Sequence, residues 1–183
     1  MSRPRAASRQ AAQALGALAI ALSALLAALL PAQAARATTE AEIKVGYLAN
    51  FAGFTEWPDR TEPLTLCLLG ADDFMVPARR LDGLRVNNHL LQLRRLATPA
   101  ALDGCQIVFI GRSARASLGN VLDALDGRPV LTIGDSDGLA RMGVMINMVL
   151  TADRVTFDIN RGATQRSGLV LSARLLQLAR EVR

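Results

Sequence analysis

Histidine and cysteine are scarce in this chain, and their scarcity excludes several kinds of site. The 183 residues contain one histidine, His89, and two cysteines. A zinc site needs three or four nitrogen or sulfur ligands, and the two cysteines are candidates for pairing with each other. Phosphate-binding loops are also lacking, because Gly111-Arg112-Ser113 has one glycine where the known fingerprints need two or three. We therefore predict no metal and no cofactor.

One short motif invites a catalytic interpretation. Gly134-Asp135-Ser136 is similar to the nucleophile block of one class of serine esterase. Such a serine needs a histidine base held by an acid, and His89 lies far upstream. The alternative is a turn in which Gly134 and Gly138 adopt unusual φ angles and Asp135 caps the next helix. A calcium loop would need further acidic positions that are absent. We predict the turn, and a protein that is not an enzyme.

The N-terminus has the three parts of a signal peptide. A basic region precedes an uncharged Ala/Leu stretch, which two small-x-small cleavage sites follow. These parts are Arg3, Arg5 and Arg9, then Ala14–Leu30, then Ala32-Gln33-Ala34 and Ala35-Arg36-Ala37. The apolar stretch is short for a membrane span, although an uncleaved anchor is the alternative. We predict that residues 1–34 are removed, or residues 1–37 if the second site is used, and that the protein is periplasmic, with no stable membrane insertion after cleavage.

The basic character of the chain comes partly from this segment. The whole sequence carries a formal charge of +5, but without residues 1–34 it has 18 basic and 16 acidic side chains. Arg79-Arg80 and Arg94-Arg95 form basic pairs, yet no basic stripe is interleaved with aromatic residues. Nucleic acid is therefore not the predicted partner.

The two cysteines, Cys67 and Cys105, both lie beside apolar runs of the exported part. In an oxidising compartment an even number of cysteines favours a disulfide. The alternative is a pair of buried free thiols. A disulfide that closes the loop between Cys67 and Cys105 would stabilise the fold by about 4 kcal/mol on the chain-entropy model.

Strands alternate with helices along residues 38–183, which predicts one domain. The predicted strands are Leu64–Leu69, Leu90–Leu96, Gln106–Ile110, Val130–Ile133 and a hairpin within Val144–Ile159. The predicted helices span about 40–55, Phe74–Leu81, 113–125, 160–167 and 172–182. Ser113 would cap the third helix and Ser172 the last. The inner face of the last helix would carry Leu171, Leu175, Leu178 and Val182. This alternation is typical of a three-layer α/β domain: a mixed, mostly parallel sheet with helices on both faces and a C-terminal antiparallel hairpin.

Two stretches carry the most local information. Val130–Asn160 contains a buried strand, a polar turn and the hairpin, so we predict that it forms the centre of the sheet. Thr39-Glu40-Ala41-Glu42 has the spacing of a capping box, and the helix that follows should end at Pro58. Trp57 would then sit at the corner after the helix, covering the edge of the core or, alternatively, forming a platform for a ligand.

Seven blocks, in order from about residue 40 to 180, resemble the YfiR family of periplasmic proteins. They are Asn50–Pro58, Leu66–Gly70, Cys105–Gly111, Pro129–Asp135, Gly143–Asn147, Phe157–Asn160 and Leu169–Leu176. Two positions depart from the family pattern: Gly134 replaces a serine, and Val144 replaces a glycine. A second cysteine pair is also lacking.

The resemblance implies a regulatory protein. The best-understood members of the family bind the periplasmic sensor domain of a membrane-anchored diguanylate cyclase and repress it, which lowers cyclic di-GMP and disfavours biofilm; we expect the same partner here. By the same analogy we expect a homodimer, and a disulfide between Cys67 and Cys105 whose reduction is a candidate switch. Phe54 and Trp57 are the candidate residues for binding the partner.

The alternative function is a small-molecule sensor or carrier in the periplasm. Open α/β sheets bind ligands beyond the C-terminal ends of their strands, here near Gly111-Arg112-Ser113 and Gly134–Gly138. Arg112 and Arg141 are the candidate partners for an anionic group on such a ligand. An esterase is a more distant third.

Overall fold

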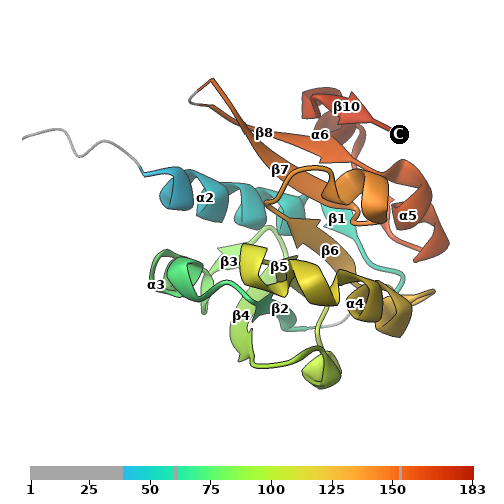
Figure 1. Cartoon of the computed structure of the whole chain (residues 1–183). Coiled ribbons are helices and arrows are strands. Elements are labelled where there is room, and N and C mark those ends of the chain that lie inside the picture. Colours follow the sequence, from blue (N-terminus) through green and yellow to red (C-terminus); the bar gives the residue numbers. More distant parts are fainter. Residues whose placement is uncertain (1–38, 60–61, 153) are drawn as a thin grey trace, which may run out of the picture. The chain divides into compact units, whose positions relative to one another are not determined.

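A computed structural model describes residues 39–59, 62–152 and 154–183 (Figure 1). The predicted signal peptide and its two cleavage sites lie outside the described residues. The first described element is helix α2 (Glu40–Gly53), and it begins with the predicted capping box. The Thr39 hydroxyl accepts from the Glu42 N–H at 3.3 Å, and the Thr39 N–H donates to the Glu42 carboxylate at 3.0 Å. That hydrogen bond, followed by one from Arg80, lowers the pKa of Glu42.

Helix α2 ends before the predicted boundary at Pro58. Its last residue is Gly53, and the next two residues form strand β1 (Thr55–Glu56). This strand pairs antiparallel with β9 (Val170–Leu171), forming a separate two-stranded sheet. Pairing with a segment more than a hundred residues away takes the chain out of the helix, so the proline is not what ends it.

Within the described residues the main sheet has eight strands, in the order β10-β8-β7-β6-β5-β2-β4-β3. In that order they are Glu181–Val182, Arg154–Ile159, Ile146–Thr151, Leu131–Gly134, Ile107–Ile110, Leu64–Leu69, His89–Leu96 and Arg85–Val86. Strands β4, β2, β5, β6 and β7 run parallel to one another. Strand β8 returns antiparallel to β7, and β3 is antiparallel to β4. The predicted mixed, mostly parallel sheet with a C-terminal hairpin is confirmed.

The predicted place of the hairpin was wrong. Strands β6 and β5 occupy the middle of the sheet, whereas β8 has only the two-residue strand β10 beyond it. The reason is connectivity: the tight hairpin puts β8 beside β7 on the outside, while helical crossovers bring β5, β2 and β4 to the other side of β6.

Alternate side chains of the central strands pack into two hydrophobic cores, one on each face of the sheet. On β2, Leu66 and Leu68 join the core that also contains Phe51 of α2 and Ala78 of α3 (Met75–Ala78). Cys67 and Leu69 point the other way, into the core under α4 (Leu118–Leu125). The helices α5 (Arg161–Arg166) and α6 (Ala173–Leu178) add Ala163 and Leu175 to the first core. Helices therefore cover both faces of the sheet, as predicted.

Three local predictions about helices were wrong in detail. The segment predicted as one helix from Phe74 to Leu81 is α3 flanked by two 3₁₀ turns, η1 (Asp72–Phe74) and η2 (Arg79–Leu81). Ser113 does not cap α4, because a 3₁₀ helix η4 (Arg112–Ser117) intervenes and the Ser113 hydroxyl donates to the Gly70 carbonyl at 2.8 Å.

The third concerns the C-terminal end. Ser172 does cap α6, accepting from the Leu175 N–H at 3.2 Å. However, the helix ends at Leu178, and the side chains of Leu178 and Val182 are 64% and 43% exposed rather than inward. The chain leaves the helix there to form β10 along β8, so a helical periodicity no longer applies.

Candidate functional site

A cavity of about 630 Å³ opens at the C-terminal ends of β2, β5 and β6. The chain leaves β2 through η1 and α3 toward β4 on one side, while β5 lies on the other side and leads into η4. Loops that diverge in this way leave a crevice at the switch point of an open α/β sheet. The N-terminal turn of α2 forms another wall of the cavity. Its volume is within the range of small-molecule sites.

Two glycines hold the mouth of this cavity in shape. A Cβ on Gly111 would lie 2.8 Å from the Ala71 Cα and closer still to the Gly70 carbonyl oxygen. Gly70 itself has a φ of +60°, and a Cβ on it would overlap the backbone nitrogen of Ala114. The loops after β2 and β5 therefore touch backbone to backbone, which only glycine allows at these positions.

An ion-pair network lines the side of the cavity next to α2. The ammonium of Lys44 is 2.6 Å from a Glu40 carboxylate oxygen and 2.8 Å from Oδ2 of Asp135, and the Lys44 side chain is only 7% exposed. The hydrogen bond from Lys44 lowers the pKa of Glu40, with a smaller contribution from the charge of Arg112. The prediction that Asp135 caps the next turn was therefore wrong. Its carboxylate accepts a hydrogen bond from Lys44 of α2, which is 91 residues away in sequence.

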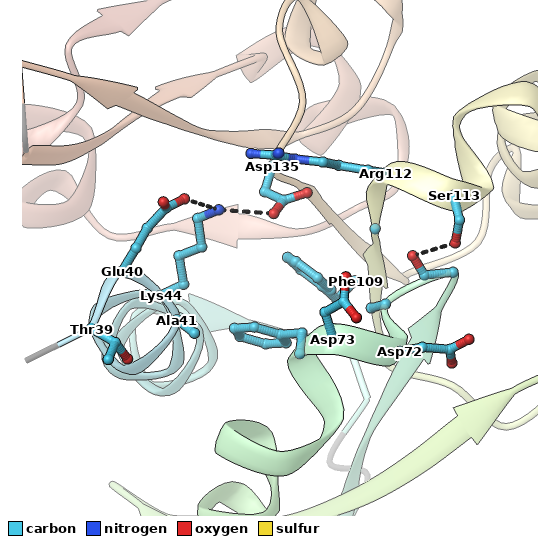
Figure 2. A pocket seen from close by; sticks show the side chains of 14 residues that line it. Thr39, Glu40, Ala41, Lys44, Asp72, Asp73, Phe109, Arg112, Ser113 and Asp135 are labelled. Atoms are coloured by element: carbon cyan, nitrogen blue, oxygen red, sulfur yellow. Dashed lines mark hydrogen bonds and ion pairs between the residues drawn. The ribbon is translucent and has the colours of Figure 1, made fainter.

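One carboxylate oxygen and one guanidinium group of the cavity have no protein partner among the described residues. Oδ1 of Asp135 is buried and accepts no hydrogen bond. Figure 2 shows the side chain of Arg112 reaching across the cavity toward Asp135, and no ion pair joins it to another described residue. The stacked rings of Phe74 and Phe109, 4.8 Å apart, add an apolar surface. The cavity thus combines an aromatic wall with both signs of charge.

The structure separates the two arginines that the sequence singled out for ligand binding. Arg112 lines the cavity just described, whereas Arg141 lines a second hollow of about 260 Å³ with Asp158, Arg180 and Arg183. In that hollow the guanidinium of Arg180 forms two hydrogen bonds with Asp158, at 2.8 and 2.6 Å. This pairing raises the pKa of Arg180. Arg112 and Arg141 therefore do not line one common binding site.

Phe54 and Trp57, the candidate residues for a protein partner, are both half-buried. The guanidinium of Arg174 lies 5.9 Å from the centre of the Phe54 ring. Trp57 meets His89 edge to face, with ring centres 5.8 Å apart, and lines a third hollow of about 140 Å³ together with Cys105. Among the described residues no acceptor bonds its indole N–H. Trp57 therefore adjoins the cysteine pair, which the sequence did not indicate.

Cys67 and Cys105 form a disulfide, with their Cα atoms 5.9 Å apart. The predicted bridge is confirmed, and the alternative of two free thiols was wrong. The bond joins β2 to the residue just before the neighbouring strand β5. Sequence reasoning missed a third participant, Arg94, whose guanidinium contacts both sulfurs. Its only signal was membership of the Arg94-Arg95 pair, which we had assigned to a half-exposed strand.

The esterase hypothesis has no geometric support. Ser136 follows the C-terminal end of β6, whereas His89 begins β4 at the opposite edge of the parallel sheet and bonds Glu62 at 2.9 Å. A nucleophile and its base must lie within hydrogen-bond reach. In the described ranges, no group of three His, Cys, Asp or Glu side chains is placed to hold a metal ion. Nor does any helix described here have the length and apolar character to cross a bilayer.

Residues 41–180 match the model of the protein family described as YfiR/HmsC-like. The chain belongs to this family. Membership in the YfiR/HmsC-like family confirms the resemblance noted from the seven sequence blocks, and it supports the role of a periplasmic regulator. The disulfide agrees with an oxidising compartment.

Solved structures resemble the YfiR/HmsC-like chain in fold alone. A domain described as the ABC domain in complex with L-Trp, from Streptococcus pneumonia, superimposes with a TM-score of 0.53 at 9% identity, covering 78% of this chain and 60% of that one. A conserved domain protein from Vibrio cholerae gives 0.56 at 9% identity, covering 79% and 60%. The chain spans about three fifths of each of these proteins.

Proposed function

We propose that the protein is a periplasmic repressor that binds the periplasmic sensor domain of a membrane-anchored diguanylate cyclase and thereby lowers cyclic di-GMP. The observation that carries the proposal is the family match over residues 41–180. The predicted signal peptide, residues 1–34 or 1–37, would deliver the chain to the compartment in which that sensor domain lies.

The test is intracellular cyclic di-GMP in a clean deletion strain. We expect a rise that the intact gene reverses, and that disappears when the gene of the cyclase that the protein represses is also deleted. An unchanged level would reject repression of a cyclase. Intact-mass measurement of the exported protein decides between cleavage after Ala34 and after Ala37, and an unprocessed mass would reject cleavage.

The proposed contact surface contains Phe54 and Trp57. Both side chains are half-buried, so part of each ring is accessible while the fold holds the rest, and aromatic side chains of this kind dominate many interfaces. Replacing both with alanine should weaken binding of the purified sensor domain at least tenfold. Met142→Ala is the matched control, because Met142 is 50% exposed and ends η5 (Leu139–Met142), which packs in the core under α4, whereas Phe54 and Trp57 pack against the other core. Equal affinity of the double variant and the control would remove this surface from the proposal.

We further propose that the repressor is a homodimer and that its activity depends on the Cys67–Cys105 disulfide. Light scattering should give twice the mass of the processed chain, and a monomer would reject the dimer. Reduction should weaken binding of the sensor domain because the bond adjoins the hollow beside Trp57. A Cys67→Ser variant that folds and represses like the wild type would reject the redox dependence.

A second candidate function, binding of a small molecule, is favoured by the cavity at the switch point. Arg112 would pair with an acidic group of the ligand, and the Phe74–Phe109 pair would contact its apolar part. A thermal-shift screen with acidic metabolites tests this. We expect Arg112→Gln to abolish the shift while Arg141→Gln keeps it; the reverse would move the ligand to the second hollow. No shift with any compound would reject the candidate.

A further inference from the structure

The guanidinium of Arg94 lies against both sulfurs of the disulfide. Arg94 is on β4 directly beside Cys67 of β2 in the parallel register. Its Nη2 lies 2.9 Å from Sγ of Cys105 and 3.3 Å from Sγ of Cys67. The same nitrogen also contacts the carbonyl oxygens of Ala101 and Asp103, at 3.4 and 2.5 Å. These backbone contacts fix the cation over the bond.

The sulfur side of this contact is buried, whereas Arg94 as a whole is half-buried. Cys67 is fully buried and Cys105 is 2% exposed. The Nε of Arg94 is buried too and donates to no described residue. The carboxylate of Asp103, the acidic side chain nearest in sequence to the bridge, pairs instead with Arg128 at 3.3 Å. No carboxylate in the described segments forms an ion pair with Arg94, so its charge is available to the sulfurs.

The strength of this contact depends on the oxidation state of the sulfurs. A disulfide sulfur is a weak hydrogen-bond acceptor, whereas a thiolate carries a full negative charge, and charge-assisted hydrogen bonds are about twice as strong as neutral ones. A guanidinium stays protonated at any pH a protein meets. Arg94 therefore stabilises the reduced form more than the oxidised form, provided that one cysteine is a thiolate after reduction.

We propose that Arg94 is a positioning residue that makes the Cys67–Cys105 bond a reversible target for dithiol reductants, by holding one of the two sulfurs as a thiolate. The proposal deepens the redox part of the proposed function and rests on it for its biological meaning. Its chemistry needs no partner protein, so it can fail or succeed independently of cyclase binding.

The exchange has two steps. A thiolate of the reductant attacks one cysteine sulfur, forming a mixed disulfide, and the S–S bond breaks with its electron pair going to the other sulfur. Whichever sulfur leaves already contacts Nη2 of Arg94. The second thiol of the reductant then attacks the mixed disulfide and releases the first cysteine. The dithiol is oxidised to its disulfide by two electrons, and its two protons go to the cysteines or, for the one held as a thiolate, to solvent.

A purely structural role for Arg94 makes a different prediction. If the arginine only ties the loop at Ala101 and Asp103 to β4, its loss destabilises the oxidised and reduced proteins alike. The equilibrium between them would then be unchanged. The equilibrium with a dithiol, and its dependence on pH, therefore separate the two roles.

The experiment equilibrates the purified exported protein with mixtures of reduced and oxidised dithiothreitol between pH 6 and 8. The oxidised fraction is read by gel shift after thiol alkylation, and independently by the fluorescence of Trp57, the only tryptophan in the chain. For the wild type, a thiolate product means that one proton is released, so the reduction constant should rise with pH, up to about tenfold per unit. For Arg94→Gln it should be about tenfold smaller at pH 7, which corresponds to about 30 mV, and nearly independent of pH.

Arg95→Gln is the matched control, because Arg95 is adjacent on β4 but pairs with Asp72 instead of the sulfurs. It should behave like the wild type. A reduction constant of Arg94→Gln within twofold of the wild type would overturn the proposal. So would a wild-type constant that does not change with pH, a measurement that needs no variant to fold. Loss of cyclase binding with these redox results intact would reject only the proposed function.

Discussion

The buried ammonium of Lys44 offers the sharpest test of the cavity described above. We predict that Lys44→Met strongly destabilises the protein even though methionine keeps most of the apolar stem. The substitution removes the one donor that reaches Oδ2 of Asp135, whose other oxygen already lacks a donor among the described residues. Asp135 would then be a charged side chain, 13% exposed, with no cation bonded to it.

The magnitude follows from burial. Removing one partner of a fully buried ion pair costs about 3–5 kcal/mol. Here Asp135 keeps 13% and Glu40 keeps 39% of its side-chain exposure, so water screens part of the lost attraction. We therefore expect a loss of about 2–3 kcal/mol in the free energy of unfolding. For a domain of this size that lowers the melting temperature by about 4–12 °C.

The assay is urea unfolding followed by circular dichroism at pH 7, with Asp135→Asn and the double variant completing a cycle. Asp135→Asn should cost less than Lys44→Met, because Lys44 retains Glu40 as a partner. The free energy of unfolding that the double variant loses should be about 1–3 kcal/mol smaller than the sum of the losses of the two single variants. A Lys44→Met protein within 0.5 kcal/mol of the wild type, or a coupling near zero, would refute the idea that this pair is buried and essential.

Three further predictions concern single features of the fold. Replacing Cys67 and Cys105 together with serine should lower the free energy of unfolding by about 4 kcal/mol, and a loss under 1 kcal/mol in urea titrations would contradict the chain-entropy estimate. Gly46 is an exposed helical site where a Cβ would meet nothing within 4 Å, so Gly46→Ala should stabilise the protein by about 1 kcal/mol. Gly111→Ala should instead lower the melting temperature sharply, because its Cβ would overlap the backbone of Gly70. Calorimetry that finds a higher melting temperature for Gly111→Ala than for Gly46→Ala would contradict both predictions. The backbone hydrogen bond of the capping box lowers the pKa of Glu42 below its ordinary value of 4.5. The ionised Glu42 carboxylate therefore stabilises the folded protein above pH 4.5, and this stabilisation is lost as the pH falls through the pKa that Glu42 has in the folded protein. The gap in urea midpoint between wild type and Glu42→Gln should accordingly close in acid, and a gap that persists at pH 2 would disprove the linkage.

The strands that sequence reasoning located best are those with strong local signals. Leu64–Leu69 was predicted with the observed bounds because an apolar run, interrupted only by Thr65, lies between Pro63 and Gly70. Strands β1, β3, β9 and β10 were missed, since two residues cannot display a period. Their existence depends on pairing with distant segments, which no local pattern encodes.

The candidate site shows the same division. The crevice beyond the strand ends was predicted from topology, and Arg112 does line it. The pairing of Lys44 with Asp135, however, joins residues 91 positions apart, and a lysine in an amphipathic helix gives no sign that its charge is buried. Ser113 was assigned a cap because its neighbours looked helical, yet its acceptor is 43 residues away. Contacts of this range depend on the assembled sheet rather than on spacing.

Strand order has one further consequence, for how the protein behaves at high concentration. Both margins of the main sheet end in strands of two residues, β3 and β10. An exposed margin of that length presents too few unpaired amide groups to template the addition of another chain. Arg85 on one margin and Glu181 on the other add charge there. Because β3 and β10 each pair with only two residues of β4 and β8, they shorten the margin available for intermolecular strand pairing, the usual route by which β-rich proteins form insoluble fibres, rather than remove it.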